Sequence, residues 1–187
     1  MSFGAKGIEL FSYATPGNGV ETFEDAMIGR DGEKTVRYEY VKKIIGEMNR
    51  FTGHYVPYQW EGAMTNRNGL STEERVIDVV FPAFSRKVRL EGTYLDLDHP
   101  LEHFDPVESF EGEYPLLMGC FTQGEKRAFT LVNMEDPGRK RANRACVNFD
   151  GPKTLMVHGK DGSRQVETGA KWEVELESGD GFFVEVL

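Results

Sequence analysis

The segment from residue 54 to residue 61 carries side chains that are suited to binding a sugar. His54, Tyr55, Tyr58, Trp60 and Glu61 all lie within these eight residues. Aromatic rings can pack against the apolar C–H face of a pyranose, and imidazole or carboxylate groups can bond to its hydroxyls. Two interpretations stay open: a carbohydrate-binding loop, or aromatic side chains that cover the end of a helix or of a β-sandwich.

Carboxylate pairs are the second candidate chemistry, because a glycosidase places two of them about 5 to 9.5 Å apart around one bond. Glu21, Glu24 and Asp25 lie close together in the sequence. A solvated acidic loop explains them better in a chain with 31 acidic residues. We therefore assign no catalytic pair.

Metal and phosphate chemistry have weak signals in the sequence. His99 and His103 have aspartates nearby, but Pro100 prevents the helix that would place both imidazoles on one face. Neither a glycine-rich phosphate loop nor a signature of a serine, cysteine or threonine nucleophile occurs. The sequence predicts no metal ligand and no cofactor.

Charge and composition narrow the expected partners. The formal net charge of −9 disfavours nucleic acid and anionic membranes as partners. We see neither a run of 18 apolar residues nor a signal-peptide pattern, so we expect no membrane partner and, by default, a cytoplasmic protein. Cys120 and Cys146 fit either two buried thiols or one disulfide, which leaves the compartment open.

Two elements are predicted near the N-terminus. The apolar run Gly7–Tyr13, followed by a Pro-Gly turn, predicts a buried strand. Apolar residues at three- and four-residue spacing predict a helix over Val36–Phe51, with Thr35 as its N-cap and Gly53 as the residue that ends it. A strand that leads into a helix is half of a βαβ unit, which needs neighbouring strands.

The middle of the chain has less regular patterning. Residues Gly53 to Gly69 are interpreted as a crossing loop, and Ser71 with Glu74 forms a candidate capping box. Val76–Phe81 fits either a short helix or a strand, and polar and apolar residues alternate over Ser85–Glu91. Aspartates and prolines then predict loops.

The last third of the chain has the pattern of an antiparallel β-sandwich or barrel. Turn residues separate six short apolar or alternating runs, and no helical period lies between them. The runs are Leu116–Thr122, Arg127–Asn133, Arg144–Phe149, Thr154–His158, Lys171–Leu176 and Gly181–Val186. We therefore divide the chain into a strand-loop-helix unit over 1–53, a connecting region over 54–113 and an antiparallel β-sandwich over 114–187.

Two groups of segments resemble one enzyme family. FGAKGIELFSYATP and DGEKTVRYEYVKKIIGEMN resemble the eighth strand and last helix of a TIM-barrel glycoside hydrolase of the β-galactosidase-like type. YPLLMGCFTQGEKRAFTLVNMEDP and SGDGFFVEVL are similar to the small C-terminal β-sandwich that follows such barrels. The resemblance covers about two thirds of the chain.

The resemblance implies a mainly β chain with an N-terminal appendage like the end of a (β/α)8 barrel. In the family, the catalytic carboxylates come from the fourth and seventh barrel strands, which have no counterpart in this sequence. Ser12, Tyr13, Thr15 and Pro16 match the substrate-facing end of the last strand, so Tyr13 joins the candidate sugar-binding residues.

We therefore expect a non-catalytic C-terminal part of a glycoside hydrolase with a structural role. The alternatives are a stand-alone carbohydrate-binding sandwich and one half of a split glycosidase. Besides carbohydrate, the expected partner is the missing barrel portion or a second copy of the chain, held through the exposed strand and helix.

Overall fold

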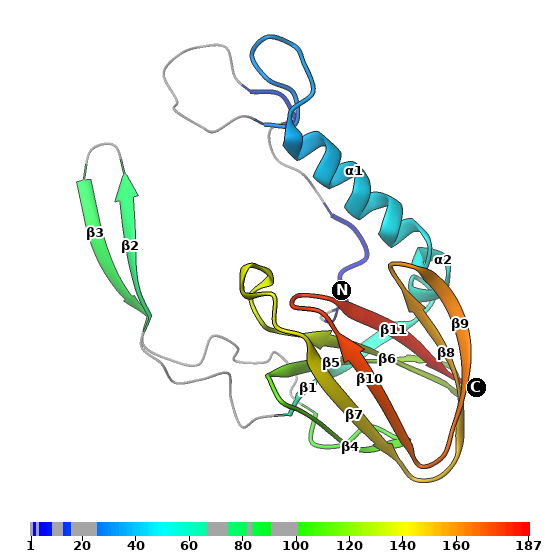
Figure 1. The fold of residues 1–187 in the computed structure, drawn as a ribbon. Coiled ribbons are helices and arrows are strands. Elements are labelled where there is room, and N and C mark those ends of the chain that lie inside the picture. The colour runs from blue at the N-terminus through cyan, green and yellow to red at the C-terminus, as the bar shows by residue number, and fades with distance from the viewer. Residues whose placement is uncertain are drawn as a thin grey trace.

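The computed structural model describes residues 2, 4–8, 13–15, 26–66, 75–81, 84–90 and 101–187, and for 75–81 and 84–90 it describes the backbone only. The described chain is mainly β, with a short helical piece before the strands (Figure 1). This confirms the predicted fold class.

The larger sheet has six antiparallel strands in the order β1-β5-β6-β11-β8-β9. These strands are β1 (Gln59–Thr65), β5 (Leu116–Gln123), β6 (Lys126–Asn133), β8 (Lys153–Gly159), β9 (Gly162–Thr168) and β11 (Gly181–Val186). The last strand of the chain, β11, lies inside this sheet, where Phe183 pairs with Thr130 of β6 and with His158 of β8. Strand β11 therefore joins the two halves of the sheet.

The smaller sheet has three antiparallel strands in the order β10-β7-β4. They are β4 (Val107–Gly112), β7 (Asn143–Phe149) and β10 (Lys171–Leu176), and a short 3-10 helix at Pro137–Arg139 precedes β7. A separate antiparallel pair consists of β2 (Arg75–Phe81) and β3 (Phe84–Leu90). Strand β1 belongs to the larger sheet and β4 to the smaller one, so each sheet contains a strand that precedes residue 114 in the sequence.

The main core lies between the two sheets. Phe129 of β6 lies 6.3 Å from Phe149 of β7 and 6.4 Å from Trp172 of β10, measured between ring centroids. In β10, Trp172 and Leu176 are buried while Glu173 and Glu175 are exposed, as the alternating sequence predicts. The two sheets therefore form a sandwich with one packed face each.

A second, smaller core covers the opposite face of the six-stranded sheet. It contains Tyr55, Tyr58, Phe121, Ala128 and Phe183. Tyr55 comes from the short helix α2 (Thr52–Tyr55), and Tyr58 lies just before β1. This core fastens α2 to the outer face of the sheet.

Helix α1 (Val36–Asn49) confirms the predicted helix and its start, with Thr35 at the N-cap position, but the predicted capping hydrogen bond and the predicted end are wrong. The Thr35 hydroxyl does not cap the helix; it donates to the carbonyl oxygens of Ala26 (2.6 Å) and Met27 (3.2 Å). Gly53 does not end α1, because Arg50 is its C-cap and Gly53 lies within α2. These hydrogen bonds tie the start of α1 to the segment that precedes it.

Several other predicted elements are corrected. The loop expected over 53–69 is wrong, because β1 occupies residues 59–65. Strand β4, at residues 107–112 of the connecting region, was not predicted. Of the two alternatives left open for Val76–Phe81, a helix or a strand, the structure has the strand. All six strands predicted after Tyr114 are present, and β9 is an additional one.

Some predictions fall outside the described residues. Gly7 and Ile8 are not in a strand, and residues 9–12 of the predicted N-terminal strand are outside the described part. The same holds for the acidic group at residues 21–25, the capping box at residues 71–74 and the histidine at position 99.

The two cysteines are buried free thiols, Cys120 on β5 and Cys146 on β7. Burial raises the pKa of the Cys120 thiol to about 12, so it is protonated at neutral pH. The sequence left open two buried thiols or one disulfide, and the structure has two thiols.

Among the residues that the structure describes, no helix has both the length and the apolar character needed to span a membrane.

Candidate functional site

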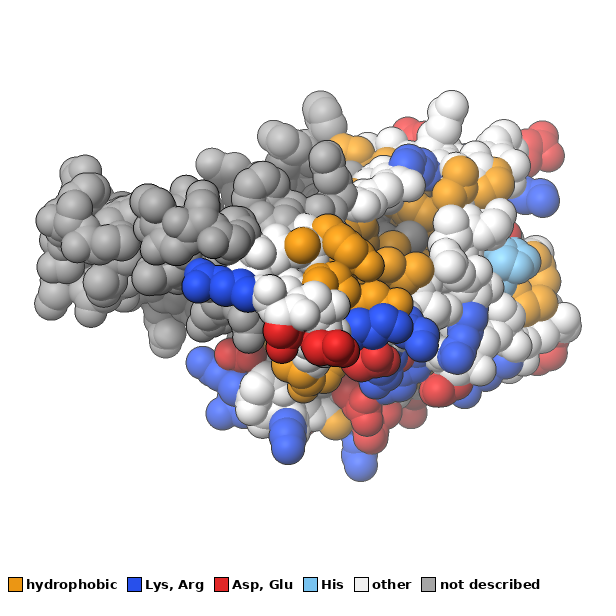
Figure 2. Space-filling view, turned by 90° about the horizontal axis from the view of Figure 1, so that it is seen from above, with side chains coloured by type: hydrophobic (Ala, Val, Ile, Leu, Met, Phe, Trp, Pro, Cys, Tyr) orange, Lys and Arg blue, Asp and Glu red, His pale blue; other side chains and the backbone are white. Residues whose placement is uncertain are grey.

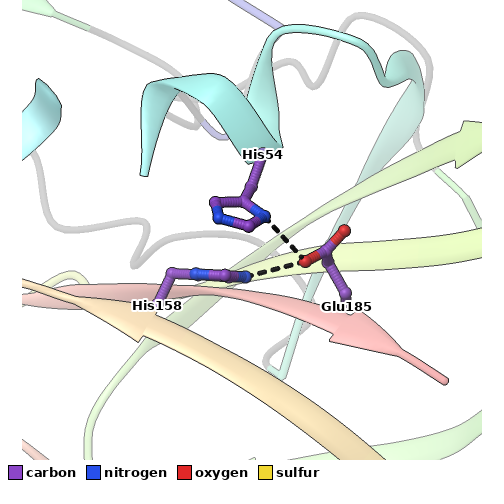
Figure 3. Close-up of side chains that lie close together, drawn as sticks. All are labelled: His54, His158 and Glu185. Carbon is purple, nitrogen blue, oxygen red and sulfur yellow. Dashed lines mark hydrogen bonds and ion pairs between the residues drawn. The ribbon is translucent and has the colours of Figure 1, made fainter. Parts of the chain in front are cut away.

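His54, His158 and Glu185 converge between α2 and the outer face of the six-stranded sheet (Figure 3). His54 comes from α2, His158 from β8 and Glu185 from β11. Within the described part of the chain, these three residues form the single group of three potential metal-ligating side chains. We call this group the His-His-Glu cluster.

The register of β8 against β11 positions two of the three side chains. His158 lies opposite Phe183, and Glu185 lies opposite Met156. Because side chains alternate along a strand, Phe183 and Glu185 point to the same face, which is the face covered by α2. Helix α2 then places the His54 ring over the His158 ring, with centroids 4.2 Å apart and planes tilted by 31°.

Hydrogen bonds hold the buried members of the cluster. Glu185 Oε2 lies 2.8 Å from His158 Nε2 and 3.3 Å from His54 Nδ1. The other carboxylate oxygen, Oε1, accepts a hydrogen bond of 2.9 Å from the Tyr58 hydroxyl. His158 Nδ1 lies 2.7 Å from Ser163 Oγ on β9. The carboxylate and the buried imidazole are therefore each fixed from two sides.

Burial differs strongly across the cluster. The side chain of His158 is 0% exposed, that of Glu185 is 15% exposed and that of His54 is 50% exposed. Burial lowers the pKa of the His158 imidazole, and the hydrogen bond to Glu185 partly opposes this shift. Burial, together with Glu185, raises the pKa of Tyr58, so its hydroxyl stays protonated and donates. At neutral pH, His158 is an uncharged imidazole.

The structure separates the residues that were predicted to bind a sugar. Tyr55 and Tyr58 are buried, and each ring makes an edge contact with Phe183 at 5.5 Å. Their faces thus pack in the small core, and Trp60 packs against the same core. Glu61 is exposed on β1, where it accepts a hydrogen bond from Thr122.

Of the predicted set, His54 belongs to the His-His-Glu cluster, and Tyr58 donates a hydrogen bond to Glu185 of that cluster. Strands β5 and β6 separate Glu61 on β1 from Glu185 on β11. Tyr13 is exposed and lies beside α1 rather than near the cluster. The structure therefore does not gather the predicted residues into one site.

Sequence reasoning missed His158 and Glu185. Each is a single polar residue in an apolar strand, in LMVHG and in FFVEV respectively. A lone titratable group at such a position needs a polar partner when the strand is buried, and this is the signal that could have found them.

An apolar cleft of about 480 Å³ lies beside α1. Most of its lining is apolar: Ile8, Tyr13, Met27, Tyr38, Val41 and Ile45. Figure 2 shows an apolar area open on the face of the molecule seen from above. None of the residues of α1 is buried, and four apolar ones are exposed: Val36, Tyr40, Ile44 and Ile45.

Comparison of the chain with models of protein families, with characterised proteins and with solved structures gave no significant match. The fold and the site therefore define this protein as a two-sheet β-sandwich with a helical N-terminal piece and a His-His-Glu cluster at the junction of the two.

Proposed function

We propose that this chain is the non-catalytic C-terminal part of a TIM-barrel glycoside hydrolase of the β-galactosidase-like type. Its N-terminal unit would complete a barrel whose other strands come from elsewhere in the same protein or from a partner chain. The sandwich would brace that barrel. The observation that carries the proposal is the exposure of α1.

Helix α1 has 14 residues, and none of them is buried. A helix of this length is only marginally stable without a surface to pack against. Its exposed apolar residues and the apolar cleft beside it offer such a surface. The outer helices of a TIM barrel pack an apolar face on neighbouring strands and helices, which is the kind of partner this cleft fits.

The sandwich is attached to the N-terminal unit by several contacts, as a bracing role requires. The ammonium group of Lys6 bonds to the carbonyl oxygens of Tyr55 and Tyr58 and lies 4.3 Å from the centre of the Tyr55 ring. The guanidinium of Arg50, which follows α1, donates to the carbonyl oxygen of Lys160 after β8. A barrel held by α1 would thus be joined to the larger sheet.

The proposal is tested by supplying the barrel portion. The reading frame immediately upstream should encode barrel strands, and its product should bind this chain. Ile45→Glu should weaken that binding by at least about tenfold, because it places a charge in the apolar cleft. Val56→Glu is the matched control, since Val56 is 45% exposed against 46% for Ile45 but lies outside α1.

Activity gives the second measurement. The isolated chain should not turn over chromogenic glycosides, whereas the assembled pair should. Turnover by the isolated chain would contradict the proposal, as would equal affinity of the Ile45→Glu and Val56→Glu variants for the barrel portion.

A further inference from the structure

We propose that His54, His158 and Glu185 bind one divalent transition-metal ion of the zinc class, and that the bound ion fastens α2 to the six-stranded sheet. This inference is independent of the proposed relation to glycoside hydrolases, because it rests only on the His-His-Glu cluster.

The positions of the donor atoms support a metal site. Each of the three residues offers one ligand atom, and these atoms all lie within 4.8 Å of one another. With zinc–ligand bonds of about 2.0–2.1 Å, the ligand atoms of a tetrahedral site lie roughly 3.3 Å apart. The contacts of Glu185 Oε2 with His158 Nε2 (2.8 Å) and with His54 Nδ1 (3.3 Å) are close to that spacing. Small side-chain movements would admit an ion between them.

Neighbouring groups orient the buried ligands, as is usual in metal sites. The Tyr58 hydroxyl holds Glu185 Oε1, which leaves Oε2 facing the two imidazoles. Ser163 Oγ lies beside His158 Nδ1. A serine hydroxyl can either donate to this nitrogen or accept from it. When Nδ1 carries the proton and donates to Ser163, the lone pair of His158 Nε2 is free to bind an ion.

The ligand types select the class of metal. Two imidazoles and one carboxylate suit zinc and its first-row neighbours, whereas Ca²⁺ and Mg²⁺ prefer sites made of oxygen ligands. The single carboxylate, Glu185, would also balance part of the charge of a divalent ion.

The position of the cluster indicates what the ion would do. His54 is half exposed, so an ion can enter from solvent on that side and keep water in its remaining coordination position. The ligands come from α2, β8 and β11, which are far apart in the sequence. An ion that binds all three would cross-link the helical piece to the sandwich.

Zinc titration of the full chain, without a histidine tag, tests the proposal by isothermal titration calorimetry. We expect one Zn²⁺ per chain, and no comparable binding of Mg²⁺ or Ca²⁺. Ser163→Ala should weaken the affinity for zinc by about tenfold. His54→Ala should weaken it more, and His54 is exposed enough for the variant to fold.

His103→Ala is the matched control. His103 is also an exposed histidine beside a carboxylate, with Nε2 2.6 Å from Asp105 Oδ1, but it lies outside the cluster. This variant should bind zinc as the wild type does. Zinc should also raise the melting temperature of the wild type and of His103→Ala, and leave that of His54→Ala unchanged.

Three results would overturn the proposal. The first is a wild-type chain that binds no zinc. The second is a His54→Ala variant with wild-type affinity, and the third is loss of binding in His103→Ala. If zinc bound without any rise in melting temperature, the ion would not fasten α2 to the six-stranded sheet.

Discussion

Asn133, at the end of β6, connects strand ends from both sheets. Its side chain is fully buried. Its amide group donates to the carbonyl oxygens of Arg141 (3.1 Å), Leu176 (3.2 Å) and Glu177 (3.1 Å), and its Oδ1 accepts from the backbone of Glu135 (3.1 Å). These contacts join β6 to the end of β10 and to the loop before β7. The Asn133 side chain thus supplies hydrogen bonds to these backbone groups, which apolar side chains could not do.

Replacing Asn133 by Ala should lower the free energy of unfolding by about 3 kcal/mol, because buried carbonyl groups lose their donor. Urea denaturation measures this change. The control is Asn148→Ala on β7, whose amide bonds to Ser109 Oγ near the surface at 2.9 Å. The Asn148→Ala substitution should lower the free energy of unfolding by only about 0.5 kcal/mol. Similar losses in the two variants would show that the Asn133 contacts carry no special weight.

Tyr55 predicts how stability changes at alkaline pH. Burial raises its pKa to about 12, whereas an unfolded tyrosine titrates near pH 10. Above pH 10 the unfolded state loses the phenolic proton first, so the free energy of unfolding falls as pH rises, by up to about 2 kcal/mol near pH 12. Below pH 10, Tyr55 is protonated in both states, and its full contribution to the free energy of unfolding is present.

Tyr55→Phe removes this dependence. The variant should lose about 1 kcal/mol at neutral pH, because the Tyr55 hydroxyl donates to the Ala5 carbonyl at 2.8 Å. Its stability should then fall less steeply than that of the wild type between pH 10 and 12. Urea unfolding of both proteins at several pH values tests this, and parallel profiles would contradict the assignment.

At the scale of elements, β11 has the most consequential position. It pairs with β6 on one side and with β8 on the other. Deleting residues 181–187 should therefore abolish cooperative thermal unfolding, because it separates β8 and β9 from the rest of the sheet. Deleting Leu187 alone is the control, since this exposed residue contributes one backbone hydrogen bond, to Thr154. Cooperative unfolding of the longer deletion, followed by circular dichroism, would refute the role of β11.

Strands with a clear alternating pattern could be predicted from sequence, whereas the two edge strands of the six-stranded sheet, β1 and β9, could not. In β10 the alternation of apolar and acidic residues matches a strand with one buried face. Strand β9 pairs with β8 alone, none of its residues is buried, and its sequence therefore has no such pattern. In β1, glycine and polar residues hide a strand whose backbone pairs with β5.

The site was harder to predict than the strands for a physical reason. His54, His158 and Glu185 are brought together by the pairing of β8 with β11 and by the docking of α2. Strand register and helix docking depend on contacts between distant residues, which local patterns do not encode. The sequence pointed to His54 and Tyr58 by their chemistry, but it could not supply their partners.

For the whole molecule, the exposed apolar surface of α1 predicts self-association when no barrel partner is present. Light scattering after size exclusion should show a mass that rises above 21.2 kDa with concentration. Ile45→Glu should keep the chain monomeric, and Val56→Glu should not. A wild-type chain that stays monomeric at high concentration would contradict this prediction.

The interior position of β11 also constrains how the protein folds during synthesis. Strands β1, β5 and β6 can pair early, and β8 with β9 forms a local hairpin. The two parts can become one sheet only after residues 181–186 have left the ribosome, because β11 lies between them. Until then, the edges of β6 and β8 present unpaired backbone groups. The nascent chain is therefore open to strand mispairing until β11 emerges.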